Sequence, residues 1–271
     1  MSELKALLFD VDGTLANTER DGHRVAFNRA FTDAGLDWHW SVDEYGWLLQ
    51  VTGGKERMRF FIEQRNPMIP ADVDVDNLII DLHEAKTRHY TQLLGEGLIP
   101  LRPGVEALLH EARATGMRMA IATTTTPENV TALLKNTLGT DSIGWFEVIG
   151  AGDVVPHKKP AGDIYTYVME KMQLAPEECL AFEDSGNGVL AVHDAGISAM
   201  VITTNDYTRD HDFKGATTVI DKLCRDEQGA VTLLSGFDPE AECIDLAAAQ
   251  RVHAAAQELS LIHISEPTRQ P

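Results

Sequence analysis

Cysteine is scarce in this chain, and the few cysteines form no pattern typical of a metal or disulfide framework. Only three occur among 271 residues, at Cys179, Cys224 and Cys243, and no pair has CxxC spacing. An odd number of widely separated cysteines argues against both a zinc site and a disulfide framework. We therefore expect neither, and we expect a protein of a reducing compartment.

Basic residues are also few, with 23 Lys and Arg against 42 Asp and Glu and a formal net charge of −19. A chain of this charge repels nucleic acid and anionic membrane surfaces unless its basic residues cluster, and the sequence contains no such cluster. A local cation or a bound metal still allows an acidic protein to bind a small anion. The charge therefore argues against polymeric anions but leaves small phosphorylated molecules as partners.

Long apolar runs are absent: no stretch approaches the 18 residues that a membrane-spanning helix needs. The first residues, MSELKALLFD, also lack the basic segment, apolar segment and cleavage site of a secretory signal. We expect a cytoplasmic monomer with no membrane or nucleic-acid partner.

Short apolar runs, several of them rich in β-branched residues, alternate with helical segments. They are LKALLFD, MRMAIATT, FEVIGA, CLAFED, SAMVITT and TTVID. This alternation is typical of a mainly parallel sheet covered by helices on both faces. The sequence therefore predicts an α/β fold.

Residues 18–98 interrupt that alternation, because apolar side chains recur there at intervals of three and four residues. We interpret 18–98 as an α-helical cap inserted into a core made of 1–17 and 99–222. A single continuous domain with several early helices is the alternative. We expect 223–259 to be a helical extension and exclude 260–271 from functional reasoning, since that segment resembles translated vector sequence.

Two aspartates, Asp10 and Asp12, end the first apolar run and are followed at once by Gly13 and Thr14. The carboxyl ends of parallel strands are where open α/β folds bind ligands. Gly13 allows the backbone to pass close to a bound anion, and Thr14 offers a hydroxyl. Taken alone, the two aspartates are equally consistent with a simple capped turn.

Three further strand ends carry polar groups that suit a phosphate. Thr123 follows AIA, Lys159 precedes Pro160, and Glu183 and Asp184 end CLAFED. Hydroxyls and backbone N–H groups hold phosphate oxygens, while a lysine neutralises them. Four strand ends together supply acid, hydroxyl, cation and acid.

These four motifs, in this order, resemble those of the haloacid dehalogenase superfamily over residues 4–222. The segments TGGKERMRFF and ATTTTPENV resemble the CbbY-type sugar phosphatases more closely. The resemblance implies a Rossmann-like core with an inserted helical cap. CbbY-type members are similar in plan to β-phosphoglucomutase and include phosphatases that remove xylulose 1,5-bisphosphate, an inhibitor of Rubisco in the Calvin cycle.

By the same resemblance, Asp10 is the nucleophile that forms an aspartyl-phosphate. A carboxylate needs no base to be nucleophilic at neutral pH, and the covalent intermediate divides a difficult displacement into two steps. Asp12 would protonate the leaving sugar oxygen and later deprotonate the attacking water. That dual role requires a pKa of Asp12 nearer to working pH than the usual value of about 3.9.

The resemblance also implies a magnesium ion, because carboxylates facing a phosphate would otherwise repel it. Its expected ligands are the side chains of Asp10 and Asp184, the backbone carbonyl of Asp12, and Glu183 directly or through water. Lys159 would neutralise Asp10 and the phosphate. Thr123, and with less weight Thr124, would hold the remaining phosphate oxygens.

Substrate choice is expected to come from the cap, whose closure would exclude water and bring further groups to the substrate. The residues assigned to substrate binding there are Glu19, His23, Gly53, Gly54, Lys55, Arg57 and Lys86. Gly53 and Gly54 permit a tight turn, and the cations suit a second phosphate. An exposed charged helix face explains Lys86 and Arg57 equally well.

The spacing of Glu19 and His23 departs from that of the commoner relatives. Three residues separate them here, in ERDGH, whereas two are usual in the relatives. The role of His23 therefore remains open.

The sequence as a whole predicts a Mg²⁺-dependent sugar-phosphate phosphatase, with xylulose 1,5-bisphosphate as the expected substrate. A phosphomutase of the β-phosphoglucomutase type is the main alternative. A non-catalytic binding protein is disfavoured because all the expected catalytic positions are occupied.

Overall fold

The computed structural model describes residues 2–51, 53–70 and 73–265. The chain divides into two compact units, one made of residues up to 16 together with those from 101 onward, and the other of residues 17–100. These are described separately below as the core and the cap. The limits of the cap differ by one and two residues from the expected 18–98, while the core unit also includes residues after 222 that were expected to form a separate extension.

A seven-stranded sheet forms the centre of the core, and all its strands but the last run parallel to their neighbours. Its order is β3-β2-β1-β4-β5-β6-β7, so β1 lies between β2 and β4. The strands are β1 (Ala6–Phe9), β2 (Arg118–Ala122), β3 (Val148–Gly150), β4 (Cys179–Glu183), β5 (Met200–Thr203), β6 (Thr218–Ile220) and β7 (Leu233–Gly236). The mainly parallel α/β sheet predicted from the apolar runs is confirmed.

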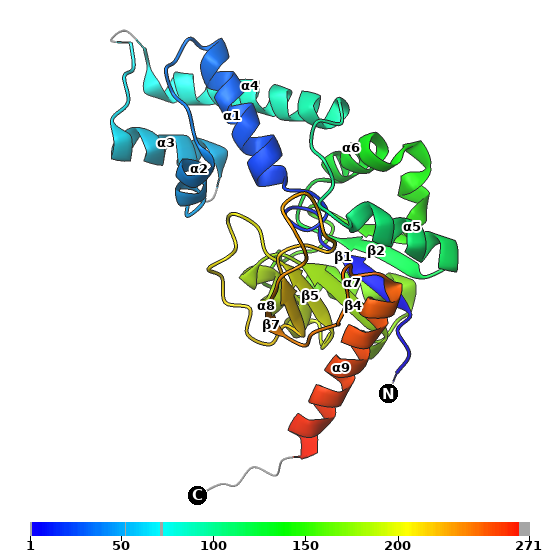
Figure 1. Cartoon of the computed structure of the whole chain (residues 1–271). Helices are drawn as coiled ribbons and strands as arrows, with labels where there is room; N and C mark the ends of the chain where they lie inside the picture. The colour runs from blue at the N-terminus through cyan, green and yellow to red at the C-terminus, as the bar shows by residue number, and fades with distance from the viewer. Residues whose placement is uncertain (1, 52, 71–72, 266–271) are drawn as a thin grey trace, which may run out of the picture. The chain divides into compact units, whose positions relative to one another are not determined.

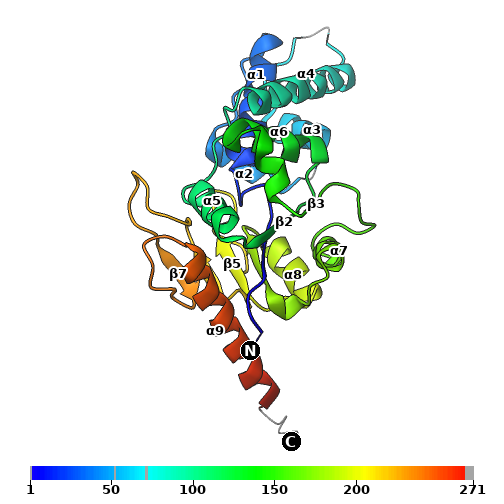
Figure 2. The ribbon, with the colours of Figure 1, turned by 90° about the vertical axis from the view of Figure 1, so that its right-hand side faces the viewer.

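Helices cover both faces of this sheet, which explains why its central strands are apolar on both sides. Figure 2 shows α7 (Asp163–Met172) and α8 (Gly186–Asp194) on one face and α5 (Val105–Thr115) and α9 (Leu246–Ser265) on the other. Alternate strand residues such as Ala6, Leu8 and Ala181 pack with Tyr165 and Val189 in one buried cluster. The remaining elements of the core are α6 (Pro127–Leu138), η2 (Thr140–Trp145) and η3 (Pro176–Glu178).

The C-terminal extension differs from the expected helix. Residues 223–245 are not helical: β7 lies within them and pairs antiparallel with β6. Only from Leu246 does a helix run, and it continues to Ser265, past the point where the expected extension ended. Alanine-rich composition predicted α9, but Pro239 and the polar residues before it do not sustain a helix. Of the tail 260–271, the last six residues lie outside the described part.

Cys224 and Cys243 form a disulfide, so the expectation of no disulfide was wrong. Counting cysteines failed because the two partners are distant in sequence but adjacent in space. The chain leaves the sheet, forms β7 and returns, and an antiparallel bridge between the two cysteines brings their backbones together. Cys179 is a buried free thiol in β4.

The cap is helical, as the apolar spacing predicted (Figure 1). It contains η1 (Thr18–His23), α1 (Arg24–Asp33), α2 (Val42–Leu48), α3 (Gly54–Arg65) and α4 (Val75–Gly95). Its core is aromatic: the indole of Trp40 contacts the rings of Phe27, Phe31 and Phe61 at centroid distances of 4.7, 4.9 and 5.4 Å. A core of this kind gives a small unit a large buried apolar area.

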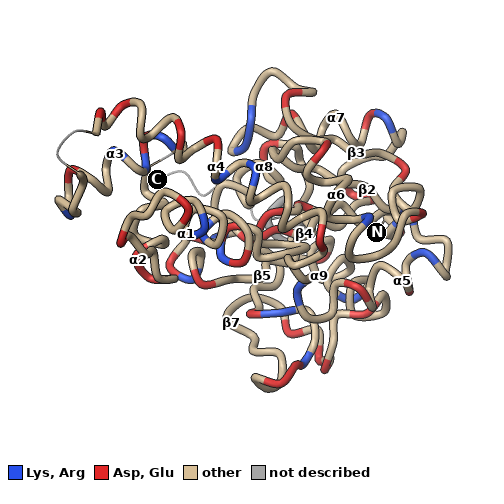
Figure 3. The backbone as a smooth tube through the Cα atoms, turned by 90° about the horizontal axis from the view of Figure 1, so that it is seen from above, with Lys and Arg blue, Asp and Glu red and all other residues tan. Residues whose placement is uncertain are grey.

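Acidic and basic residues are interspersed along the chain (Figure 3). Among the described residues, no helix combines the length and apolar character required to cross a bilayer.

Candidate active site

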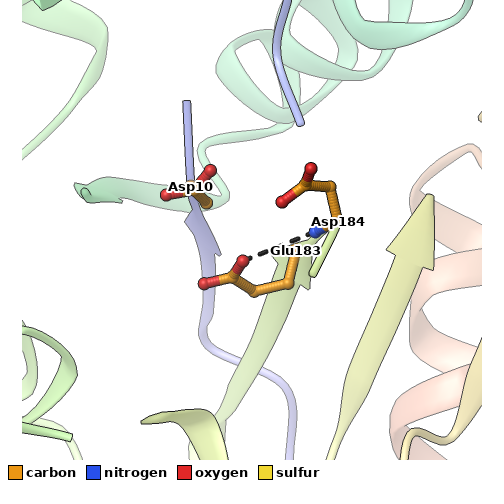
Figure 4. Close-up of side chains that lie close together, drawn as sticks. All are labelled: Asp10, Glu183 and Asp184. Atoms are coloured by element: carbon orange, nitrogen blue, oxygen red, sulfur yellow. Dashed lines mark hydrogen bonds between the residues drawn. The ribbon is translucent and has the colours of Figure 1, made fainter. Parts of the chain in front are cut away.

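Three buried carboxylates meet at the carboxyl ends of two neighbouring strands (Figure 4). Asp10 follows β1, while Glu183 and Asp184 end and follow β4, and β1 pairs with β4 in a register that places Phe9 opposite Phe182. One oxygen from each of the three side chains lies within 4.8 Å of the others. The sheet register therefore brings the first and last of the four sequence motifs together.

Lys159 joins two of these carboxylates. Its Nζ lies 2.6 Å from Asp10 Oδ1 and 2.5 Å from Glu183 Oε1, and its side chain is 8% exposed. Burial lowers the pKa of Lys159, but the carboxylates of Asp10 and Glu183 outweigh that effect and raise it above the usual value. Lys159 therefore stays charged and fixes one oxygen of Asp10.

Glu183 is held on both sides. Its Oε1 also accepts a hydrogen bond from the Tyr165 hydroxyl at 2.6 Å, and its Oε2 accepts one from the Asp184 N–H at 3.4 Å. Burial and the charge of Asp10 raise the pKa of Glu183 to about 7, against the opposing effects of Lys159 and Tyr165. Because Glu183 already binds Lys159 and Tyr165, its main role in the cluster is to hold Lys159 in place.

Asp184 lies beside two other buried acidic side chains, Asp10 and Glu183. Burial, Asp10 and Glu183 raise its pKa well above the usual value, although a hydrogen bond from Asn205 opposes this. Three buried carboxylates facing one lysine leave a net negative charge that a divalent cation would neutralise. Oxygen-only ligands suit a hard cation such as Mg²⁺, so the residues present fit the expected metal.

The turn after β1 approaches Asp184 closely at Gly13. Its φ is +83°, and a Cβ built there would lie 2.1 Å from Asp184 Oδ2. Only glycine satisfies both the backbone conformation and the space. The turn is closed by a hydrogen bond from the Gly13 N–H to the Ala16 carbonyl at 2.7 Å, next to the half-buried Asp12 and the buried Thr14.

The two threonines after β2 differ in exposure. Thr123 is buried and its hydroxyl accepts a hydrogen bond from the Thr125 N–H at 3.3 Å, whereas Thr124 is exposed.

A second polar cluster lies within the cap. The Tyr45 hydroxyl donates to Glu19 Oε2 at 2.5 Å and accepts from Arg57 Nη1 at 2.9 Å. Burial raises the pKa of Glu19, but His23, Tyr45, Arg57 and Lys86 together lower it below the usual value. Arg57 is 9% exposed, which argues against a solvated helix face as the explanation for this residue.

Lys86 and His23 form the other half of this cluster. Lys86 Nζ lies 2.8 Å from His23 Nδ1, and the His23 ring stacks on Tyr90 with centroids 3.9 Å apart. Burial lowers the pKa of His23 to about 4, so the imidazole is neutral and accepts a hydrogen bond from the ammonium group. Burial is also the main cause that lowers the pKa of Lys86 to about 8.

The unusual spacing of Glu19 and His23 has a structural counterpart. Thr18–His23 form a π-helix, in which the Arg24 N–H donates to the Glu19 carbonyl five residues earlier. A π-turn accommodates one extra residue within a helix and is frequent at functional sites. The wide turn places both Glu19 and His23 in the cap's polar cluster.

The glycine pair of the cap lies at the start of α3. Gly53 has φ +94° and precedes the helix, and a Cβ on Gly54 would lie 2.9 Å from the His83 ring. Lys55 is half-buried in the first turn of α3. The described part includes these three residues of TGGKER but not Thr52.

Four residues of these clusters were not predicted from the sequence. Tyr165 contacts Glu183, Asn205 contacts Asp184, Tyr45 bridges Glu19 and Arg57, and Arg102 binds the turn that contains Gly13. Tyr165 lies only six residues after Lys159, and this proximity to a predicted catalytic residue could have identified it as a candidate. The others come from segments that contain none of the catalytic motifs.

The match with a family model decides the family. Residues 4–196 match the model of haloacid dehalogenase-like hydrolases. The chain belongs to this hydrolase family. The matched region contains all four strand-end motifs, and the resemblance inferred from them is confirmed.

Individual relatives narrow this haloacid dehalogenase-like hydrolase to the CbbY type. Protein CbbY of Rhodobacter capsulatus is 49% identical over 214 residues, which cover 79% of this chain and 91% of that protein. A crystal structure of a CbbY variant from Rhodobacter sphaeroides in complex with xylulose 1,5-bisphosphate matches with a TM-score of 0.65 and 43% identity, covering 81% of this chain and 94% of that one. This hydrolase is a phosphatase of the CbbY type.

The likeness to one solved β-phosphoglucomutase shows the fold alone. The enzyme from Clostridium difficile matches with a TM-score of 0.55 and 21% identity over 81% of this chain and 91% of that one.

Proposed function

We propose that this hydrolase is a Mg²⁺-dependent phosphatase that removes one phosphate from xylulose 1,5-bisphosphate through an aspartyl-phosphate on Asp10. The observation that carries the reaction type is the position of Asp10, buried between Lys159 and Asp184 at the end of β1. The substrate is supported by the CbbY relative of 43% identity that binds xylulose 1,5-bisphosphate.

Asp10 is suited to nucleophilic attack because only one of its oxygens is tied to Lys159. In the first step the other oxygen, Oδ2, attacks phosphorus, a new O–P bond forms, and the bond from phosphorus to the sugar oxygen breaks. In the second step water attacks the same phosphorus, releases inorganic phosphate and restores the carboxylate of Asp10. Lys159 stabilises negative charge throughout because its raised pKa keeps it protonated.

Asp12 completes the proton transfers. It lies two residues after the nucleophile, at the turn closed by Gly13 and Ala16. As general acid it gives its proton to the leaving sugar oxygen, and as general base it takes one from the attacking water. The proton is therefore balanced over the two steps.

The expected Mg²⁺ would be held by Asp10 and Asp184, with the Asp12 carbonyl as a further ligand. When bound, it supplies positive charge that neutralises the carboxylates and the transferring phosphoryl group. Glu183 contributes indirectly, because its hydrogen bonds with Lys159 and Tyr165 hold the lysine beside Asp10.

Cap residues would bind the rest of the substrate. Arg57 and Lys86 are cations held in defined positions by Tyr45 and His23, and Lys55 lies in the first turn of α3. Three cations suit a phosphate that is not transferred, and Glu19 suits the sugar hydroxyls. A bisphosphate uses all of them, whereas a monophosphate leaves the cations without their anion.

Asp10→Asn provides the direct test. Purified enzyme with magnesium and xylulose 1,5-bisphosphate should release phosphate, whereas the Asn variant should lose at least about 1,000-fold in kcat because an amide cannot form the acyl-phosphate. Asp210→Asn is the matched control, since Asp210 is an exposed aspartate of the core. Turnover retained by Asp10→Asn would reject the nucleophile.

A substrate panel tests the specificity. We expect a higher kcat/KM for xylulose 1,5-bisphosphate than for pentose or hexose monophosphates. Isomerised sugar phosphate without free phosphate would instead identify a phosphomutase.

For this function we expect the enzyme to be a monomer in the cytoplasm of a carbon-fixing cell. Removal of a Rubisco inhibitor there assists the Calvin cycle. Light scattering coupled to size-exclusion chromatography should give the mass of one chain, 29.8 kDa.

A further inference from the structure

The side-chain amide of Asn205 is fixed in one orientation by its own loop. Its Oδ1 accepts a hydrogen bond from the Tyr207 N–H at 2.9 Å, and its backbone N–H donates to the Thr208 hydroxyl at 3.1 Å. Because an N–H group must face an acceptor, the oxygen end of the amide is the one that faces Tyr207. The NH₂ end of Asn205 therefore faces away from Tyr207.

That NH₂ end covers one oxygen of Asp184. Asn205 Nδ2 donates to Asp184 Oδ2 at 2.7 Å. The Gly13 turn covers the same oxygen, since a Cβ on Gly13 would lie 2.1 Å from Asp184 Oδ2 and 2.8 Å from Asn205 Nδ2. Within the described part of the chain, Asp184 Oδ1 accepts no hydrogen bond. The two oxygens of this carboxylate are therefore not equivalent.

We propose that Asn205 restricts Asp184 to binding a cation through one oxygen and thereby favours Mg²⁺ over Ca²⁺. This inference rests on the proposed metal site. Mg²⁺ requires near-octahedral geometry with short bonds, which one oxygen per carboxylate satisfies. Ca²⁺ takes more ligands and readily binds a carboxylate through both oxygens, which would require Asp184 Oδ2 to leave Asn205. Asn205 is thus a positioning residue that acts through Asp184.

The decisive measurement is calorimetric titration of the substrate-free full-length protein with MgCl₂ and, separately, with CaCl₂. Asn205→Ser can still accept the Tyr207 N–H but cannot reach Asp184 with an amide, and Asn205→Ala removes both interactions. Relative to wild type, we expect the ratio of the Ca²⁺ and Mg²⁺ dissociation constants to fall about tenfold in both variants, as for loss of other outer-shell partners. Asn136→Ala, on the exposed surface of α6, should leave the ratio unchanged.

Infrared difference spectra of the wild-type protein give a second readout that needs no variant. Addition of either cation should produce the carboxylate stretching pattern of one-oxygen binding. A pattern of two-oxygen binding with Ca²⁺ in wild type, or a dissociation-constant ratio within twofold of wild type in a folded Asn205→Ser protein, would overturn the inference while leaving the phosphatase proposal intact. Absence of Mg²⁺ binding by wild type would overturn the proposed metal site and this inference together.

Discussion

The guanidinium of Arg102 donates a hydrogen bond to the backbone carbonyl of Gly13. The same group binds the carbonyls of Thr203, Thr204 and Asp221 at 2.9, 2.6 and 2.8 Å. Arg102 is 7% exposed, and it thus connects the turn after β1 with the carboxyl ends of β5 and β6. One buried cation holds the backbone of the catalytic turn against the edge of the sheet.

Replacement of Arg102 by methionine should destabilise the core and misplace this turn. Several buried carbonyls would lose their donor, so the free energy of unfolding should fall by about 3 kcal/mol or more. We also expect kcat to fall at least about tenfold in the folded fraction, with a smaller change in KM. Urea unfolding and steady-state kinetics measure the two effects. Arg225→Met, at an exposed position, is the control, and an unchanged kcat in Arg102→Met would show that the arginine only stabilises.

Gly13→Ala should nearly abolish activity. The new Cβ would meet Asp184 Oδ2 at 2.1 Å, and the φ of +83° is unfavourable for alanine by roughly 1–2 kcal/mol. Gly116→Ala separates the two effects, because Gly116 has φ +75° but no atom within 4 Å of the added Cβ. The positive φ should lower the stability of both variants, and thermal unfolding measures this loss. Only Gly13→Ala should lose phosphatase activity, and equal activities would contradict the proposed role of the turn.

Tyr165→Phe tests the anchor of Glu183. The hydroxyl is buried and donates to Glu183 at 2.6 Å, so its removal should cost about 1–3 kcal/mol of unfolding free energy. Because Glu183 also positions Lys159, kcat should fall, while the ring itself continues to pack from α7 against the buried cluster of the sheet. Tyr167→Phe, in the same helix, is the matched control. Equal stability of the two variants would argue against a significant hydrogen bond at Tyr165.

The pH dependence of substrate binding should report on Lys86. Its pKa is lowered to about 8 by burial, with Arg57 acting in the same direction and Glu19 opposing. The ammonium form, which attracts phosphate, prevails below that pH and is lost above it. KM for the bisphosphate should therefore rise as pH increases through about 8. In Lys86→Arg the rise should be absent up to about pH 10, because arginine remains charged; the same rise in that variant would exclude Lys86 as its source.

Strand ends were the most informative feature of the sequence. Parallel strands align their carboxyl ends, and this brings Asp10, Glu183 and Asp184 together at one edge. Lys159 was expected at a strand end, but it reaches Asp10 and Glu183 from a loop that follows β3. Their catalytic roles remain predictions. Helical periodicity likewise indicated the cap, because its aromatic core requires apolar residues at three- and four-residue intervals.

The residues that were missed share a physical cause. Asn205 and Arg102 act through a side-chain amide orientation and through backbone carbonyls, and neither leaves a pattern in the sequence. Cys224 and Cys243 meet because the chain makes an excursion through β7, which is a property of the fold rather than of cysteine spacing. Contacts between loops that are far apart in the sequence can be identified only from the three-dimensional structure.

The π-helix at Thr18–His23 bears on how such caps can change by insertion. An extra residue in a regular α-helix would rotate every following side chain by about 100° and turn Phe27 and Phe31 out of the aromatic core. A π-turn instead takes up one residue more than an α-helical turn, and α1 follows it with Phe27 and Phe31 buried. The wide turn therefore allows the spacing between Glu19 and His23 to change while the packing of the aromatic core of the cap stays the same.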